Sequence, residues 1–162
     1  MDMISRVRPT WPLLAALASG AMLAVAHASQ RFGGLQPCPL CLDQRNWHWG
    51  VVAVGLIGFI ATRISPRVTR LAALAVGLVL LGSTAQAAYH VAVEQHWVVA
   101  NCDARIDLDD IRPLDFGTPL QAPACDQIAW QMFGISMAGY NAIASLLLTL
   151  ASFAVALLPE RK

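Results

Sequence analysis

Two cysteines separated by two residues, Cys38 and Cys41, lie in a segment that reads Pro-Cys-Pro-Leu-Cys. A disulfide that closes so short a loop constrains little of the unfolded chain, so it adds little stability. The spacing is instead typical of thiol–disulfide exchange, in which a thiolate attacks a disulfide sulfur and electrons pass between sulfur pairs. Cys38 and Cys41 are therefore predicted to be redox-active.

The residues that follow this pair favour a thiolate at Cys41. A predicted helix starts close behind it, and the free backbone N–H groups and the dipole at a helix N-terminus stabilise a negative charge. Arg45 follows one helical turn later, so its guanidinium can share a face with Cys41. The alternative role for Arg45 is an interfacial anchor whose charged end reaches the membrane surface.

A second pair, Cys102 and Cys125, has 22 residues between its members. A structural bridge there would close a loop of about 24 residues and add roughly 3 kcal/mol to stability. Four cysteines allow three pairings, so the connectivity stays open, and a bridge such as Cys41–Cys102 could be a working intermediate. No metal site is predicted, because zinc ribbons need two closely spaced cysteine pairs and the histidines here are scattered.

Long runs without a charged residue predict the helices that position these cysteines. The chain is 57% hydrophobic and 13% charged, against about 25% charged in soluble domains. A membrane-spanning helix needs about 20 apolar residues. The sequence therefore predicts an all-α membrane protein, a four-transmembrane-helix bundle in one integral membrane domain, residues 1–162. The expected helices are 12–29, 46–63, 70–90 and 134–157. A net charge of +1 without a basic stripe gives no reason to expect nucleic acid.

The basic residues predict the orientation of this bundle. Seven of the eleven Lys and Arg residues fall where four spans place them on one side: Arg6, Arg8, Arg63, Arg67, Arg70, Arg161 and Lys162. The positive-inside rule makes that side cytoplasmic, with both termini. The loops of about 30–45 and 91–133, which hold all four cysteines, then face outward, in a bacterium the oxidising periplasm.

The N-terminus allows a second interpretation. Arg6 and Arg8, an apolar run and residues 26–28 (Ala-His-Ala) resemble a signal peptide with its cleavage site. We favour a retained helix, because the run has the length of a membrane span. Small residues also recur one turn apart, a spacing that suits close helix packing. They are Gly20, Ala24 and Ala28 in the first helix and Gly134, Ala138 and Ala142 in the fourth.

His90 ends the third predicted helix at the outer surface. An ionisable group at membrane depth is a functional candidate, and the alternative is a neutral histidine bonded to a backbone carbonyl. The segment beyond it, residues 94–126, is acidic and interrupted by Pro and Gly. This composition predicts an irregular, mobile loop that could carry Cys102 toward a partner.

Taken together, these features resemble the DsbB family of disulfide bond formation proteins. The similarity covers nearly the whole chain: four spans, the CPLC segment after the first, Gln44-Arg45 behind it, a second cysteine pair in the second outer loop, and Trp130 with residues 133–137 entering the fourth helix. The combination of C-x-x-C, an arginine four residues later and four spans is more specific than any one of these features.

The resemblance implies a protein thiol:quinone oxidoreductase in the bacterial inner membrane. Cys102 and Cys125 would oxidise a periplasmic thioredoxin-fold partner similar to DsbA, with Cys102 in the mixed disulfide. Electrons would pass to Cys38 and Cys41, and Cys41 would face a membrane quinone of the ubiquinone or menaquinone type. The quinone pool would connect the protein to the respiratory chain.

The resemblance also assigns two binding residues. Arg45 matches the family's arginine at the quinone site, and His90 matches the histidine near it. Where the family usually has a glutamine four residues after that histidine, this chain has Glu94, followed by Gln95. The alternatives are a relative of the vitamin K epoxide reductases, whose C-x-x-C usually lies late in the chain, and a non-catalytic membrane protein with bridged outer loops.

Overall fold

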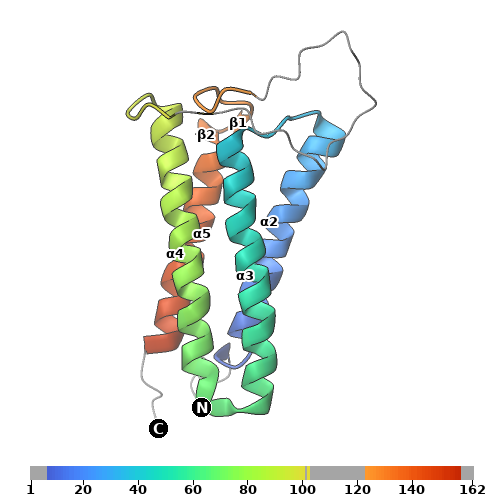
Figure 1. The fold of residues 1–162 in the computed structure, drawn as a ribbon, viewed down its shortest axis with the longest axis vertical. Coiled ribbons are helices and arrows are strands. Elements are labelled where there is room, and N and C mark those ends of the chain that lie inside the picture. Colours follow the sequence, from blue (N-terminus) through green and yellow to red (C-terminus); the bar gives the residue numbers. More distant parts are fainter. Residues whose placement is uncertain (1–6, 101, 103–122, 158–162) are drawn as a thin grey trace.

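The structure is a computed structural model and describes residues 7–100, 102 and 123–157. Its long helices are α2 (Trp11–Gly33), α3 (Pro39–Ile64), α4 (Thr69–Glu94) and α5 (Met137–Leu157), and a short 3-10 helix, η1 (Pro66–Val68), joins α3 to α4. The helices form a bundle with η1 at one end and a hairpin of β1 (Gln131–Met132) and β2 (Ile135–Ser136) at the other (Figure 1). The predicted all-α, four-helix fold is confirmed.

The four helices are long and apolar enough to cross a membrane. The candidate spans have 21 to 29 residues, and about 20 are needed. Large apolar side chains are exposed on the outside of the bundle, among them Ile57, Ile60, Leu71 and Leu147. An apolar surface of this kind faces lipid in a membrane protein. The chain is a multi-pass membrane protein.

Three helices extend farther toward the hairpin end than the charge-free runs predicted. α2 ends at Gly33 rather than at 29, α3 begins at Pro39 rather than at 46, and α4 ends at Glu94 rather than at 90. Charged residues near a helix end do not stop the helix, because their long side chains can reach polar surroundings. The mobile loop predicted within 94–126 lies mostly outside the described residues.

Close approach at two glycines of α3 joins this helix to its neighbours. A Cβ atom on Gly55 would lie 2.6 Å from the Pro12 carbonyl oxygen and 2.9 Å from the Ala16 Cβ, both on α2. A Cβ atom on Gly58 would lie 3.2 Å from the Ala72 Cβ on α4. Small residues allow such contact between helix backbones in a membrane.

The small-residue stripe predicted in α2 does not make a helix contact of this kind. Among the described residues, no atom of another element lies within 4 Å of a Cβ placed on Gly20. Ala24 and Ala28 are exposed. The prediction for α2 was wrong because a one-turn spacing identifies a face of the helix without showing which face meets a neighbour.

Buried polar side chains connect the helices through hydrogen bonds. Ser83 of α4 and Ser145 of α5 are 3.2 Å apart, hydroxyl to hydroxyl. At the η1 end, Arg8 donates from Nε to the Val155 carbonyl oxygen at 2.8 Å. Lipid offers no hydrogen-bond partners, so such groups must pair within the bundle. These bonds fix α5 against α4 and tie the start of α2 to the end of α5.

The hairpin sets where α5 begins. Its strands pair antiparallel, with Gln131 opposite Ser136. The turn residues Phe133 and Gly134 have φ values of 51° and 77°, as in the tight turns that join such strands. α5 therefore starts at Met137 rather than at the predicted 134.

We expect Gly55→Ala to destabilise the bundle, because its new methyl group meets a backbone oxygen that cannot move by itself. Overpacking of this kind costs about 1–3 kcal/mol. Gly20→Ala is the matched control, since the same methyl group has open space there. Thermal unfolding in detergent should show a lower Tm for Gly55→Ala alone. Equal Tm values for the two variants would contradict the packing.

Candidate functional site

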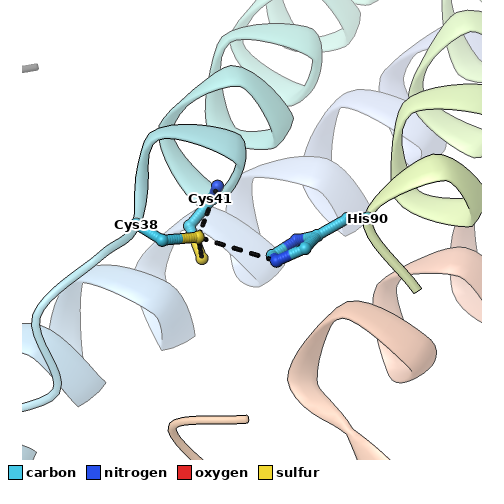
Figure 2. A group of neighbouring side chains, drawn as sticks. All are labelled: Cys38, Cys41 and His90. Atoms are coloured by element: carbon cyan, nitrogen blue, oxygen red, sulfur yellow. Dashed lines mark hydrogen bonds between the residues drawn. The ribbon is translucent and has the colours of Figure 1, made fainter. Parts of the chain in front are cut away.

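The C-x-x-C segment forms the first turn of α3. Cys38 is the N-cap residue, with extended backbone, and its sulfur accepts a hydrogen bond from the Cys41 N–H at 3.2 Å. Pro39 takes the first helical position, where its fixed φ suits the helix, and a residue before proline prefers extended backbone. The sulfurs of Cys38 and Cys41 therefore lie together, 2.6 Å apart (Figure 2).

His90 of α4 points toward this pair, as Figure 2 shows. Its Nε2 lies 3.6 Å from Cys38 Sγ, and its Nδ1 lies 2.7 Å from Nε2 of Gln44 on α3. Cys38, Gln44 and His90 are all buried. Three residues singled out from the sequence, Cys38, Cys41 and His90, thus meet between two helices.

The surroundings of Cys38 keep its proton in place. The hydrogen bond with Cys41 raises the pKa of the Cys38 thiol above its ordinary value, and burial raises it further. Cys38 therefore tends to keep its proton, which it can donate to the Cys41 sulfur. Arg45 supplies a positive charge near the Cys41 sulfur.

Arg45 connects α3 to the end of α2. Its Nη1 donates to Gln30 Oε1 at 2.6 Å, and its Nη2 donates to the Ala26 carbonyl oxygen at 3.3 Å. The side chain is half-buried and lines the same cavity as Cys41. α2 therefore holds the guanidinium beside the cysteine pair, and the role of Arg45 there stays a prediction.

Glu94, at the end of α4, completes this side of the site. Its carboxylate accepts a hydrogen bond from the Ser136 hydroxyl, and a carboxylate oxygen lies 3.9 Å from His90 Nε2. Ser136 also accepts the Gly139 N–H at 3.0 Å, the usual arrangement of a helix N-cap. One serine thus joins the hairpin, the start of α5 and the acidic end of α4.

A cavity of about 450 Å³ lies beside the cysteine pair, between all four long helices. Apolar side chains of α2 form one side of it, including Met22, Leu23 and Val25. Its polar residues include Cys41 and Arg45 together with Gln44, His48, His90, Glu94 and Asn141. This volume is within the range of about 300–1,000 Å³ that small-molecule sites occupy. An apolar molecule with a few polar atoms would fit such a site.

The second cysteine pair packs against the first. Cys102 and Cys125 form a disulfide with their Cα atoms 6.2 Å apart. Cys38 and Cys125 are buried in one apolar cluster with Val93, and Cys41 and Cys102 pack against that cluster. All four cysteines therefore meet at the hairpin end of the bundle, although 60 or more residues separate the two pairs in sequence.

The sulfurs of Cys38 and Cys41 and a ring nitrogen of His90 could together hold a metal ion. Their potential ligand atoms lie within 4.8 Å of one another, and thiolate and imidazole are the ligands that zinc prefers. The sequence predicts that no metal is bound there, and that stays a prediction.

Sequence reasoning missed four polar residues of the site: Gln44, His48, Ser136 and Asn141. A signal for two of them was available, because Gln44 and His48 stand three and seven residues after Cys41 and so share its helix face. Asn141 and Ser136 lie nearly a hundred residues away, and only the tertiary structure places them here.

A membrane bundle that holds a C-x-x-C pair in the wall of a largely apolar cavity, with a disulfide packed beside it, has the features of a membrane-embedded disulfide oxidoreductase. Sequence comparison supplies the family. Residues 8–155 match the sequence model of DsbB, disulfide bond formation protein DsbB, and the chain belongs to that family. Membership implies disulfide oxidoreductase activity, and the resemblance seen in the sequence is confirmed.

Similar proteins agree with this membership. A disulfide bond formation protein B from Actinobacillus pleuropneumoniae serotype 5b (strain L20) is 31% identical in an alignment of 169 positions, which covers 98% of this chain and 90% of that protein. One from Shewanella loihica is 31% identical in an alignment of 167 positions, which covers 96% of this chain and 94% of that protein. One from Acinetobacter baumannii is 32% identical in an alignment of 146 positions, which covers 85% of this chain and 84% of that protein. No solved structure gives a significant match.

We expect Ser136→Ala to destabilise the hairpin end of the bundle. The change removes the N-cap of α5 and the donor to the buried Glu94 carboxylate, a loss of about 1–3 kcal/mol. Ser29→Ala is the matched control, because the Ser29 hydroxyl donates to the Val25 carbonyl oxygen of its own helix. Denaturant unfolding in detergent checks the difference, and equal stability of the two variants would show that the Ser136 bonds contribute little.

Proposed function

We propose that this chain is an inner-membrane protein thiol:quinone oxidoreductase. It reoxidises a periplasmic thioredoxin-fold dithiol protein of the DsbA type and passes the electrons to a membrane quinone, of the ubiquinone or menaquinone type. Its turnover sustains disulfide bond formation outside the cytoplasm and feeds the respiratory chain through the quinone pool. The acting residues are Cys38, Cys41, Cys102 and Cys125, with Arg45 and His90 at the quinone.

One observation carries this proposal: both cysteine pairs contact a single buried cluster, and Cys38 and Cys41 also line a largely apolar cavity. Disulfide exchange requires sulfurs that can come into contact. A quinone, which is mostly apolar, requires a largely apolar binding site, such as a cavity between the helices. Cys38 meets both requirements, because it packs with Cys125 and also lines the cavity.

The exchange steps balance by sulfur chemistry alone. A thiolate of the partner attacks the Cys102 sulfur, breaking the Cys102–Cys125 bond and forming a mixed disulfide. The partner's second thiol then displaces Cys102, which releases the oxidised partner and leaves Cys102 and Cys125 as thiols. These thiols reduce a Cys38–Cys41 disulfide in the same way, and their own disulfide forms again.

The cavity residues fit a quinone. The ring and its tail are apolar, as is the α2 side of the cavity, and the ring oxygens are hydrogen-bond acceptors that suit the Arg45 guanidinium. When bound, the quinone supplies the acceptor for the two electrons and two protons that the Cys38 and Cys41 thiols release. Arg45 would hold a quinone oxygen beside Cys41, and His90 lines the same cavity.

Charge placement supports the orientation. Arg63 lies in the last turn of α3 and Arg67 lies in η1, at the end of the bundle opposite the hairpin and the cysteines. The positive-inside rule then makes the η1 end cytoplasmic and the cysteine end periplasmic. A periplasmic partner can reach Cys102, which is only partly buried.

We expect the purified protein to transfer electrons from a reduced DsbA-like protein to a soluble quinone analogue, followed by quinone absorbance. Cys41→Ser and Cys102→Ser should each reduce the rate to that of the mixture without enzyme, because each removes one pair from the path. Ser65→Ala, at the other end of α3, is the control and should keep the full rate.

Turnover that survives either cysteine substitution would sink the proposed path. Absence of turnover in the unchanged protein, with both pairs oxidised and the bundle folded, would favour the alternative of a non-catalytic protein with bridged loops.

A further inference from the structure

A line of hydrogen bonds runs through buried polar side chains to the cysteine pair. His48 Nε2 lies 2.7 Å from Asn141 Oδ1, and Asn141 Nδ2 donates to Gln44 Oε1 at 2.7 Å. Gln44 Nε2 lies 2.7 Å from His90 Nδ1, and His90 Nε2 lies 3.6 Å from Cys38 Sγ. His48, Gln44 and His90 are each less than 10% exposed, so water competes little for these bonds.

The Asn141 amide gives this line a direction. Its Oδ1 can only accept, and it accepts from the Ser145 hydroxyl as well, at 3.2 Å. His48 must therefore donate from Nε2. Its buried Nδ1, which has no partner among the described residues, then carries the lone pair of a neutral ring. Gln44 accepts from Asn141 with its carbonyl oxygen, so the NH₂ group of Gln44 faces His90.

The side-chain amide of Gln44 in turn determines which neutral tautomer His90 adopts. Because Nδ1 accepts from the Gln44 amide, the ring proton sits on Nε2. Two groups near Nε2 can accept this proton: the Cys38 sulfur at 3.6 Å and a Glu94 carboxylate oxygen at 3.9 Å. His90 therefore acts toward Cys38 as a hydrogen-bond donor and not as a base.

The same donor-to-acceptor direction of the hydrogen bonds can continue from Cys38 to Cys41. The Cys38 sulfur can accept from His90 and accepts from the Cys41 N–H. Its own proton is then available to the Cys41 sulfur, which lies within hydrogen-bond distance. In such a chain each donor polarises the next and strengthens its bond. A Cys38–Cys41 disulfide has neither a thiol proton nor a thiolate, so only the reduced pair gains the full effect.

We propose that His48, Asn141 and Gln44 are positioning residues that hold His90 as an Nε2–H donor and thereby stabilise the reduced Cys38/Cys41 pair. The Cys38–Cys41 disulfide is then a stronger oxidant than it would be without these hydrogen bonds. The inference deepens the proposed function and rests on it in one respect, that a stronger oxidant here drives electron transfer from Cys102 and Cys125.

Asn141→Leu tests the proposal, because Asn141 touches neither cysteine. In a full-length chain with Cys102→Ser and Cys125→Ser, equilibrated in dithiothreitol buffers, we expect the equilibrium constant for reducing Cys38–Cys41 to fall about tenfold, or about 30 mV. Asn46→Leu, at an exposed asparagine of α3, is the matched control and should leave the constant unchanged. An unchanged constant in Asn141→Leu would overturn the proposal.

Ring-nitrogen NMR of isotopically labelled histidine gives a second test, whose deciding result is measured on the unchanged protein. In the reduced chain we expect His90 to carry its proton on Nε2 alone, and Asn141→Leu should produce a mixture of tautomers. A proton on Nδ1 in the unchanged protein, alone or as part of an imidazolium, would refute the proposal. Neither measurement uses quinone or partner protein, so failure of the proposed function appears separately, in the turnover assay.

Discussion

The hydrogen bond from the Cys41 N–H to the Cys38 sulfur fixes the first turn of α3, and the rest of the site depends on that turn. With the helix starting at Pro39, residues 41, 44, 45 and 48 return to one side, because their spacings of three, four and seven match the helix period. That side is a wall of the cavity. A rotation of the helix by one residue, about 100°, would turn this whole set of side chains away from the cavity.

The membrane then decides what these polar residues do. Lipid cannot satisfy a buried amide or imidazole, so Gln44, His48, His90 and Asn141 must satisfy one another. The bonds that result join α3, α4 and α5 around the cavity. Helix packing and the proposed redox role of His90 therefore depend on the same contacts, since the hydrogen bonds that join the helices also end on the Cys38 sulfur.

The sequence predicts much of this because a membrane imposes simple rules. Charge-free runs give the four helices, and two-residue spacing marks Cys38 and Cys41 as a reactive pair. The helix ends were less predictable: α3 begins seven residues early because Pro39 and the Cys38 cap start it before the charged residues end. Asn141 and Ser136 could not be assigned at all, because their partners are about 40 to 100 residues away and sequence periodicity carries no long-range contacts.

The central claim is that the two cysteine pairs exchange electrons directly within one buried cluster. The most direct measurement uses a chain with Cys41→Ser and Cys102→Ser, which keeps one cysteine of each pair, oxidised with glutathione disulfide and mapped by peptide mass spectrometry without reduction. The packing of Cys38 and Cys125 around Val93 predicts an intramolecular Cys38–Cys125 disulfide in most molecules. Separate glutathione adducts on Cys38 and Cys125 in the folded protein would contradict the account.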